Sequence, residues 1–413
     1  MSTAWSHRYA QRTQSVRSSV IRELLKLTQR PEIISFAGGL PAPELFPVER
    51  FEQACHTVLA QNGAAALQYG PTEGYVPLRE LIARHMRRYG IIADVGNILI
   101  TCGSQQALDL IGKLLIDTGD CVLVEAPTYL GALQAFNVYG AKYVSVPVDH
   151  DGIRVDSLDE VLRTGPKFMY VLPNFQNPAG VTLSEERRQR LVLLANAYGI
   201  PIVEDDPYGQ LRYEGGHGTP LVVLDRNNQR TDEQYLSGNV MYTSTLSKLL
   251  APGLRLGWMV APQEVITRLV QLKQGADLHT STFIQMVAYE AARDGFLDQH
   301  VRKLRAVYRE RRDTMLAALQ EFFPQEATWT RPEGGLFLWV TLPEATDCEA
   351  LFHAALRQNV AFVPGSAFYA DEQPGCHLRL NFSNSKPEQI REGIRRLGEA
   401  VKEQLRTSVM AGA

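Results

Sequence analysis

The chain has 413 residues, of which 45% are hydrophobic and 21% are charged, and its formal net charge is −3. This composition is typical of a globular protein in water, and the length predicts two domains. The small negative charge argues against nucleic-acid binding, and no apolar run reaches the roughly 18 residues that a membrane span requires. The N-terminal segment lacks the apolar stretch of a signal peptide, so we expect a cytoplasmic protein.

Cysteine and histidine spacing predicts neither a disulfide framework nor a metal site. The nine histidines show no HExxH or similar ligand spacing. The five cysteines are odd in number and form no CxxC pair, so we expect free thiols in a reducing cytosol. These cysteines are Cys55, Cys102, Cys121, Cys348 and Cys376.

From about residue 75 onward, helical and strand patterns alternate. The expected helices are 76–90, 104–119 and 129–140, followed by further helices between later strands. The expected strands are 97–103, 121–125, 142–148, 167–173, 200–207, 240–245 and 256–262. Because their apolar runs suit strands covered on both faces, the pattern predicts an α/β fold with a mostly parallel sheet.

The pattern changes after about residue 296. A long charged helix is expected over 296–323, and strands are expected over 334–343, 360–369 and 377–383. We therefore predict a smaller α+β domain, which includes an N-terminal arm with one helix over 18–29. The predicted boundaries are 1–45 for the arm, 46–295 for the large domain and 296–413 for the small domain.

Several familiar nucleotide and hydrolase motifs are absent from the sequence. Neither GxGxxG nor GxxxxGK[ST] occurs. An SxxK hydrolase also fails, because Thr245 stands three residues before Lys248 and neither SDN nor KTG is present. The alternating pattern must therefore serve a different chemistry.

The stretch "STLSKLLAPGLRLGW" places Lys248 just after an apolar strand, where α/β folds position reacting groups. Arg255 follows between two leucines, and a partly buried arginine needs an anion. A phosphate would serve, and so would a carboxylate of the protein itself. A solvated loop lysine is the plain alternative for Lys248.

A second strand-to-helix junction, "TCGSQQALDL", offers Gly103, Ser104 and Gln105 in the first turn of a helix. A helix N-terminus presents free N–H groups and a positive dipole end, so it can hold a phosphate. An N-capping serine is also common without any ligand, so this segment alone leaves both interpretations open.

Two more strand ends add polar groups. In "VEDDPYGQLRY", Asp205 and Tyr208 follow a strand, and in "NFQNPAGVTLS" Asn177 precedes a proline at a turn. Taken with Lys248, these residues supply an amine, a carboxylate for a cationic ring nitrogen, and a phenol and an amide for a ring oxygen. Together with the phosphate-binding turn, this set matches pyridoxal 5'-phosphate.

Over nearly its whole length the sequence resembles the class I and II aminotransferases, fold type I of the pyridoxal-phosphate enzymes. The segments "IRELLKLTQRPEIISFAGGLPAPELFP", "LQYGPTEGYVPLR", "GSQQALDL" and "LKQGADLHT" are similar to the 2-aminoadipate aminotransferase group. The resemblance implies a large domain with a mostly parallel seven-stranded sheet and a smaller α+β domain. It also implies a transaminase of broad specificity that acts on L-amino acids and 2-oxo acids such as 2-oxoglutarate.

The resemblance also assigns roles to individual residues. Lys248 would bind the cofactor covalently, Asp205 would face the ring nitrogen (with Asp206 as the rival carboxylate), and Tyr208 would lie beside the ring oxygen. Other cofactor contacts would come from Gly103, Ser104, Gln105, Tyr129, Asn177, Thr245, Ser247, Arg255 and, from the other subunit of a homodimer, Tyr69. Substrate contacts would come from Arg379, Asn177, Gly39, Arg22 and Ser19.

The substrate and the reaction class keep alternatives at this stage. Amino donors of the 2-aminoadipate, glutamate, leucine, aromatic and kynurenine types are all handled within this group. A lyase or racemase is possible on the same scaffold, since fold does not fix chemistry. A transcription regulator with an aminotransferase-like domain is disfavoured, because only about 40 residues with no basic patch precede the cofactor domain.

Overall fold

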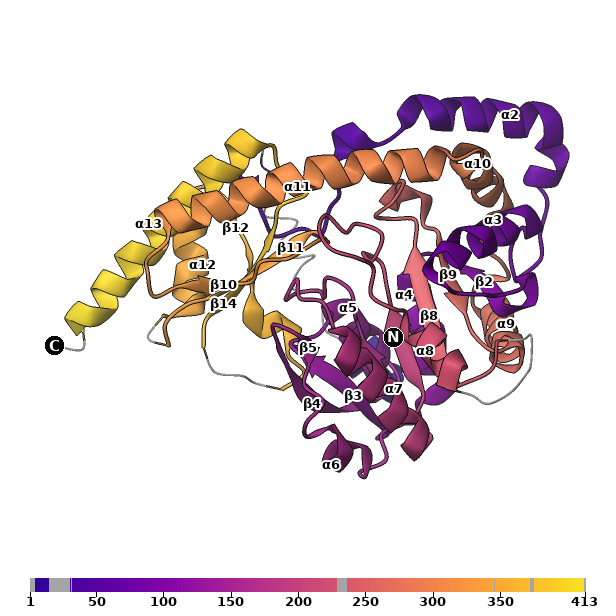
Figure 1. Cartoon of the computed structure of the whole chain (residues 1–413), viewed down its shortest axis with the longest axis horizontal. Helices are drawn as coiled ribbons and strands as arrows, with labels where there is room; N and C mark the ends of the chain where they lie inside the picture. Colours follow the sequence, from indigo (N-terminus) through magenta and orange to yellow (C-terminus); the bar gives the residue numbers. More distant parts are fainter. Residues whose placement is uncertain are drawn as a thin grey trace.

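The computed structural model describes residues 4–14, 30, 32–228, 236–344, 346–371 and 375–411. Figure 1 shows a large part built on one sheet and a smaller part built on another, with the long helix α11 (Phe296–Phe322) running across both. The C-terminal helix α13 (Pro387–Ala411) packs along α11 at the small end of the molecule.

The large sheet has the strand order β2-β9-β8-β7-β6-β3-β4-β5. Strands β8, β7, β6, β3 and β4 pair in parallel, whereas β9 is antiparallel to both β2 and β8. All seven expected strands are present, and the short β5 adds an eighth at the edge by pairing antiparallel with β4. Their bounds are β2 (Ile98–Thr101), β3 (Cys121–Ala126), β4 (Lys142–Asp149), β5 (Gly152–Ile153), β6 (Met169–Val171), β7 (Ile202–Asp205), β8 (Val240–Thr245) and β9 (Gly257–Val260).

Alternate strand residues enter two different cores, so helices cover both faces of this sheet. Leu99, Val122, Val203 and Met259 pack with one group of helices. Ile98 and the strand residues on the same face of the sheet pack with a second group. The first group is α4 (Ser104–Leu115), α5 (Leu130–Asn137) and α9 (Gln263–Asp277). The second group is α3 (Val76–Met86), α6 (Leu158–Leu162), α7 (Glu185–Tyr198) and α8 (Leu221–Asn228).

The small sheet is antiparallel and has the order β10-β11-β14-β13. Its strands are β10 (Thr328–Trp329), β11 (Phe337–Thr341), β13 (Val363–Pro364) and β14 (His377–Asn381). A separate parallel pair joins β1 (Ile34–Ser35) to β12 (Val360–Ala361), which attaches the segment before the large sheet to the C-terminal part. The remaining α-helices in the described part of the chain are α2 (Val48–Ala66) with α10 (Thr282–Ala292), which pack on each other, and α12 (Cys348–Arg357).

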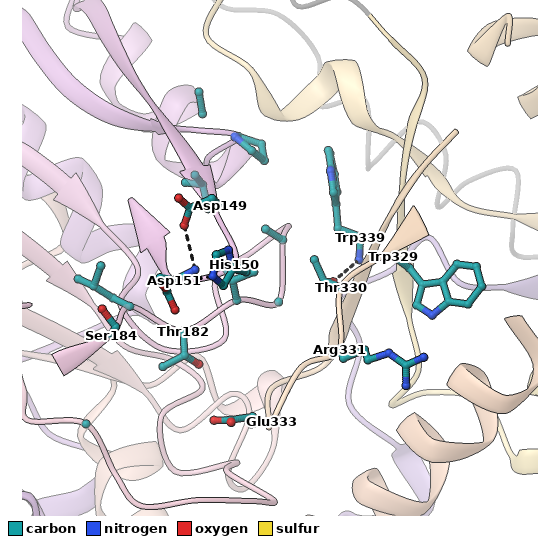
Figure 2. A pocket seen from close by; sticks show the side chains of 18 of the residues that line it. Asp149, His150, Asp151, Thr182, Ser184, Trp329, Thr330, Arg331, Glu333 and Trp339 are labelled. Carbon is teal, nitrogen blue, oxygen red and sulfur yellow. Dashed lines mark hydrogen bonds and ion pairs between the residues drawn. The ribbon is translucent and has the colours of Figure 1, made fainter. Parts of the chain in front are cut away.

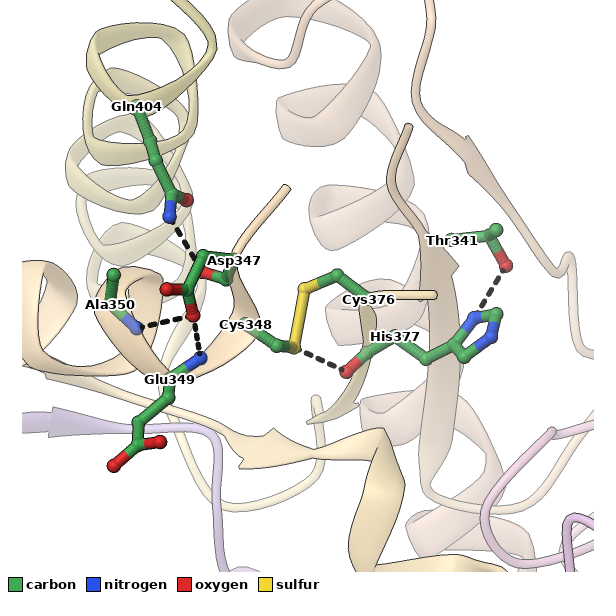
Figure 3. Close-up of a disulfide and its surroundings, with 8 residues drawn as sticks. All are labelled: Thr341, Asp347, Cys348, Glu349, Ala350, Cys376, His377 and Gln404. Atoms are coloured by element: carbon green, nitrogen blue, oxygen red, sulfur yellow. Dashed lines mark hydrogen bonds between the residues drawn. A yellow bond between two sulfur atoms is a disulfide. The ribbon is translucent and has the colours of Figure 1, made fainter. Parts of the chain in front are cut away.

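The expectation that all cysteines are free thiols is wrong for one pair. Cys348, at the start of α12, forms a disulfide with Cys376, just before β14, with their Cα atoms 5.0 Å apart (Figure 3). The two residues are 28 positions apart, and only the folding of α12 against this sheet brings them together. Cys55, Cys102 and Cys121 are free. The bond ties α12 to the strand that carries Arg379.

Candidate active site

The carboxyl ends of the parallel strands converge on one cavity of about 260 Å³. Side chains from the ends of β7 and β8, from the start of α4 and from β14 of the small sheet all reach it. The cavity is lined by Gly39, Leu40, Ser104, Gln105, Tyr129, Leu172, Asn177, Asp205, Pro207, Tyr208, Thr245, Ser247, Lys248, Pro252, Arg255, Phe337 and Arg379. Most of the residues singled out from the sequence are therefore neighbours in space.

Lys248 follows the end of β8 and places its amine inside this cavity. The Nζ atom donates a hydrogen bond of 2.7 Å to the carbonyl oxygen of Gly39. Burial lowers the pKa of Lys248 to about 8, and the cations Arg379 and Arg255 act in the same direction. An amine with this pKa is partly neutral near physiological pH, so it can act as a nucleophile or as a base.

Asp205, the last residue of β7, carries a buried carboxylate oxygen without a partner. Its Oδ2 accepts a hydrogen bond of 2.8 Å from the Tyr170 hydroxyl, whereas its Oδ1 has no hydrogen-bond partner although the side chain is 1% exposed. Burial raises the pKa of Asp205 to about 7, against the opposing effect of the Tyr170 hydrogen bond. A buried carboxylate of this kind needs a cationic or donor group, and no other described side chain supplies one.

Asp206, the rival carboxylate, lies in a different environment. Its Oδ1 accepts hydrogen bonds from Asn174 (3.0 Å) and from the Gly209 amide (2.8 Å), and its Oδ2 accepts one from Tyr242 (3.1 Å). Asp206 does not line the cavity. Since adjacent residues leave a strand in opposite directions, the structure separates the two acids as the strand pattern predicts.

The turn between β2 and α4 meets Arg255 so closely that only glycine fits. Gly103 has a φ of +75°, and a Cβ atom there would lie 2.5 Å from Nη2 of Arg255. The same guanidinium donates to the Cys102 carbonyl at 3.3 Å. The N-terminal N–H groups of α4, the Arg255 cation and the hydroxyls of Thr245 and Ser247 thus lie at one end of the cavity, where an anion would be stabilised.

Arg379 brings a cation from the small sheet to the other side of the cavity. It is 1% exposed, donates from Nη2 to the Ala37 carbonyl at 2.6 Å, and donates from Nη1 to Oδ1 of Asn177 at 3.0 Å. Its guanidinium stacks on Phe337 and Phe368, at 4.4 and 4.8 Å from the ring centres. Its Nε atom has no partner, so the guanidinium retains capacity for an anionic ligand.

Two tyrosines complete the cavity wall. Tyr129 stands directly before α5, and Gly131 lacks the Cβ atom that would collide with its ring at 2.4 Å. Tyr208 is 4% exposed and meets Phe337 edge to face, with ring centres 5.8 Å apart. Burial raises the pKa of both hydroxyls, so these phenols remain protonated hydrogen-bond donors.

Two of the expected site residues that the structure describes, Gly103 and Tyr69, are not among those that line this cavity. Tyr69 is 79% exposed and packs edge to face on His279, with ring centres 5.8 Å apart. Arg22 and Ser19, together with the helix expected around them, lie outside the described residues. No group of three potential metal-ligating side chains occurs among the described residues, and none of the helices described there is long and apolar enough to cross a membrane.

A larger cleft of about 900 Å³ lies between the large part and the small sheet. Figure 2 shows Asp149, His150 and Asp151 on one side of it, facing Trp339 and Thr330 on the other. Its lining contains no lysine, and Asp149 is already bound by Arg187 at 2.6 and 2.8 Å. We therefore place the chemistry in the smaller cavity around Lys248.

Sequence reasoning missed the aromatic groups that hold the polar ones in place. Tyr170 fixes one oxygen of Asp205, and the rings of Phe337 and Phe368 both lie against the guanidinium of Arg379. The lone hydroxyl in the otherwise apolar stretch "KFMYVLP" was a usable signal for Tyr170, because a buried phenol needs a partner. Nothing in the sequence marks the two phenylalanines as different from ordinary core residues.

Comparison with solved structures defines the class to which this fold and cavity belong. The structure of the alpha-aminoadipate aminotransferase from Thermus thermophilus, complexed with N-(5'-phosphopyridoxyl)-L-leucine, matches with a TM-score of 0.91 and 43% sequence identity. The match covers 98% of this chain and 100% of that one. The architecture is therefore that of an aminotransferase with a large mixed sheet and a small antiparallel sheet.

Sequence comparisons give the family. The model of "Aminotransferase class I and II" matches residues 38–397. The chain is 46% identical to the aromatic-amino-acid aminotransferase 1 of Thermococcus litoralis, over 96% of this chain and 95% of that protein. It is 45% identical to the 2-aminoadipate transaminase of Thermus thermophilus, over 97% and 98%. The chain belongs to the class I and II aminotransferases, and it is an enzyme of amino-group transfer.

Proposed function

We propose that this protein is a pyridoxal-phosphate-dependent aminotransferase of broad specificity, which moves the amino group between an L-amino acid and a 2-oxo acid such as 2-oxoglutarate. The observation that carries the proposal is that the Lys248 amine and the unpartnered carboxylate oxygen of Asp205 belong to the same cavity. The relatives named for aminoadipate and aromatic amino acids support the substrate class.

The residues present fit the cofactor. The unpartnered Oδ1 of Asp205 suits a protonated ring nitrogen, and the glycine-only turn at Gly103 beside Arg255 suits a phosphate. Tyr208 and Asn177 would hold the ring oxygen, and Tyr129 would stack on the ring. The phosphate would be held by Gly103, Ser104, Gln105, Thr245, Ser247 and Arg255. When bound, pyridoxal phosphate supplies an aldehyde for amino groups and a ring that delocalises negative charge.

The protein's own groups then perform orientation and proton transfer. Arg379 grips the substrate carboxylate together with Asn177, which fixes the direction of the bonds at the α-carbon. The Lys248 amine, whose lowered pKa of about 8 leaves part of it neutral, would take the proton from that carbon. Gly39, whose carbonyl already holds the lysine, positions the amine and borders the substrate. Asp205 keeps a negative charge at the far end of the site.

Substrate choice would depend on the N-terminal arm. A donor such as glutamate or 2-aminoadipate carries a second carboxylate, whereas leucine and phenylalanine end in an apolar group. By its resemblance to the aminoadipate group, Arg22 would meet that second carboxylate, with Ser19 one turn earlier. Arg22→Ala is expected to raise the activation free energy that corresponds to kcat/KM by about 1.5–3 kcal/mol for the acidic donors, and to leave the value for leucine nearly unchanged. Equal losses for both donor groups would contradict a side-chain-reading role.

The active form would be a homodimer with shared sites. Tyr69, 79% exposed in the single chain, would reach the phosphate of the other subunit. Exposed apolar side chains lie on α2 or directly after it, at the start of α3 and directly after α9, and a second copy would cover them: Val48, Leu59, Leu67, Val76 and Leu278. Sedimentation of the purified protein gives the mass, and mixed dimers of Tyr69→Phe with Lys248→Ala subunits test the sharing.

The proposal is tested with a panel of amino acids and 2-oxoglutarate, scoring product formation and the half-reaction spectra. Transfer that is stoichiometric and requires the oxo acid is expected for at least one of the aminoadipate, glutamate, leucine, aromatic or kynurenine donors. Product formation without an oxo acid indicates a lyase, and inversion of the α-carbon indicates a racemase. Specific binding of duplex DNA without turnover supports a regulator instead.

A further inference from the structure

A fully buried lysine lies behind the phosphate-binding turn, outside the cavity. Lys273, four residues before the end of α9, has a side chain that is 0% exposed, which is rare for lysine and demands full pairing. Its Nζ atom donates to both carboxylate oxygens of Asp277, at 2.8 and 2.7 Å, and to Oε1 of Gln106 at 2.8 Å. All three donors of the ammonium group are therefore used.

Gln106 connects this ion pair to the turn before α4. Its Nε2 donates to Oδ2 of Asp277 at 2.7 Å, and its Oε1 accepts the backbone N–H of Cys102 at 2.8 Å. Gln106 is the third residue of α4, and its side chain reaches back to an N–H that precedes the helix, much as in a capping box. The Cys102 thiol also lies 3.4 Å from the Asp277 carboxylate.

The opposite side of the same turn faces the cavity. The Cys102 carbonyl receives Nη2 of Arg255, and the next residue, Gly103, packs against that guanidinium. Ser104 and Gln105, which follow directly, line the cavity. A shift of this backbone would therefore move both Arg255 and the N–H groups at the start of α4.

Charge gives the ion pair a second effect. A lone carboxylate at Asp277 would attract the positive end of α4 and repel a phosphate bound at that end. Burial disfavours the charged carboxylate, but the hydrogen bonds from Lys273 and Gln106 outweigh it and lower the pKa of Asp277. The carboxylate stays ionised, and the Lys273 ammonium, in contact with both of its oxygens, cancels its charge.

We propose that Lys273, Asp277 and Gln106 form a positioning network for cofactor phosphate, holding the Cys102–Gly103 turn and keeping its surroundings free of unbalanced negative charge. The inference rests on the proposed cofactor. None of the three residues lines the cavity, so each acts through the turn.

The test compares pyridoxal phosphate with pyridoxal, which lacks only the phosphate, in titrations of the cofactor-free full-length protein. Lys273→Met is expected to weaken pyridoxal phosphate about 10- to 100-fold, the range of one charge-assisted contact, and to leave pyridoxal within about twofold. The double variant Lys273→Met/Asp277→Asn removes the unbalanced charge and keeps a partner for Gln106, so it is expected to recover most of the loss.

Arg187→Met is the matched control, because it also removes the cation of an ion pair, the partly buried pair with Asp149, at a site away from the cavity. It is expected to leave the ratio of the two affinities unchanged. Retained pyridoxal binding shows that each variant is folded at the site. Equal weakening of both ligands by Lys273→Met, or no recovery in the double variant, overturns the network. Failure of the unaltered protein to bind pyridoxal phosphate overturns the proposed function itself, and the network with it.

Discussion

Asp205→Asn is expected to stabilise the cofactor-free protein increasingly as the pH rises. The folded protein raises the pKa of Asp205 from 3.8 to about 7 through burial. The unfolded chain therefore releases this proton at lower pH than the folded chain does, and the free energy of unfolding falls as the pH rises from about 4 to about 7. The full increase in the pKa of Asp205 corresponds to a loss of about 4 kcal/mol in the free energy of unfolding, of which about 3 kcal/mol is lost between about pH 5 and pH 8.5.

The assay is urea unfolding of the cofactor-free proteins at those two pH values. Relative to the unaltered protein, Asp205→Asn should gain about 3 kcal/mol between the lower and the higher pH, and comparing the two conditions cancels any constant cost of the new amide. Asp206→Asn is the control, because its carboxylate oxygens already accept three hydrogen bonds; it should destabilise the protein. With pyridoxal phosphate bound, Asp205→Asn should instead be less stable than the unaltered protein. A stability difference that does not change with pH would refute the assigned burial and charge of Asp205.

Three further outcomes are expected. Uptake of pyridoxal phosphate by the cofactor-free protein should accelerate as the pH rises through about 8, since burial gives Lys248 that pKa, and Lys248→Ala should abolish the covalent uptake. Arg379→Gln should raise the activation free energy that corresponds to kcat/KM for amino acids by about 2–4 kcal/mol, measured by steady-state kinetics. It should lose little cofactor, measured by absorbance. Cys348→Ser should cost about 3–4 kcal/mol of unfolding free energy under oxidising conditions, and nothing once the native protein is reduced.

The fold was predictable from the sequence because short apolar runs mark most of its strands. Strands such as β3 and β8 are buried on both faces, so their runs of Val, Leu and Met stand out without any partner information. The two-residue β5 escaped prediction, since it is defined only by its pairing with β4. The Cys348–Cys376 disulfide escaped for a similar reason, because sequence spacing carries no information on which elements pack together.

The candidate site was predictable where chemistry demands a residue type and not where packing does. Asp205 ends one parallel strand and Lys248 closely follows the end of the next, so their shared cavity could be expected from parallel topology. Phe337 lies in a separate part of the chain, and only the docking of the small sheet brings it to Arg379. Lys273 was hidden because an amphipathic helix normally exposes its lysines.

The central claim is that Lys248 is the amine to which the cofactor binds. Its most direct test is borohydride reduction of the protein loaded with pyridoxal phosphate, followed by proteolysis and mass spectrometry of the labelled peptide. We predict a single phosphopyridoxyl adduct, on Lys248 in the segment after β8, and its loss in Lys248→Ala. An adduct on another lysine, or a reduced protein that carries none, would contradict the account.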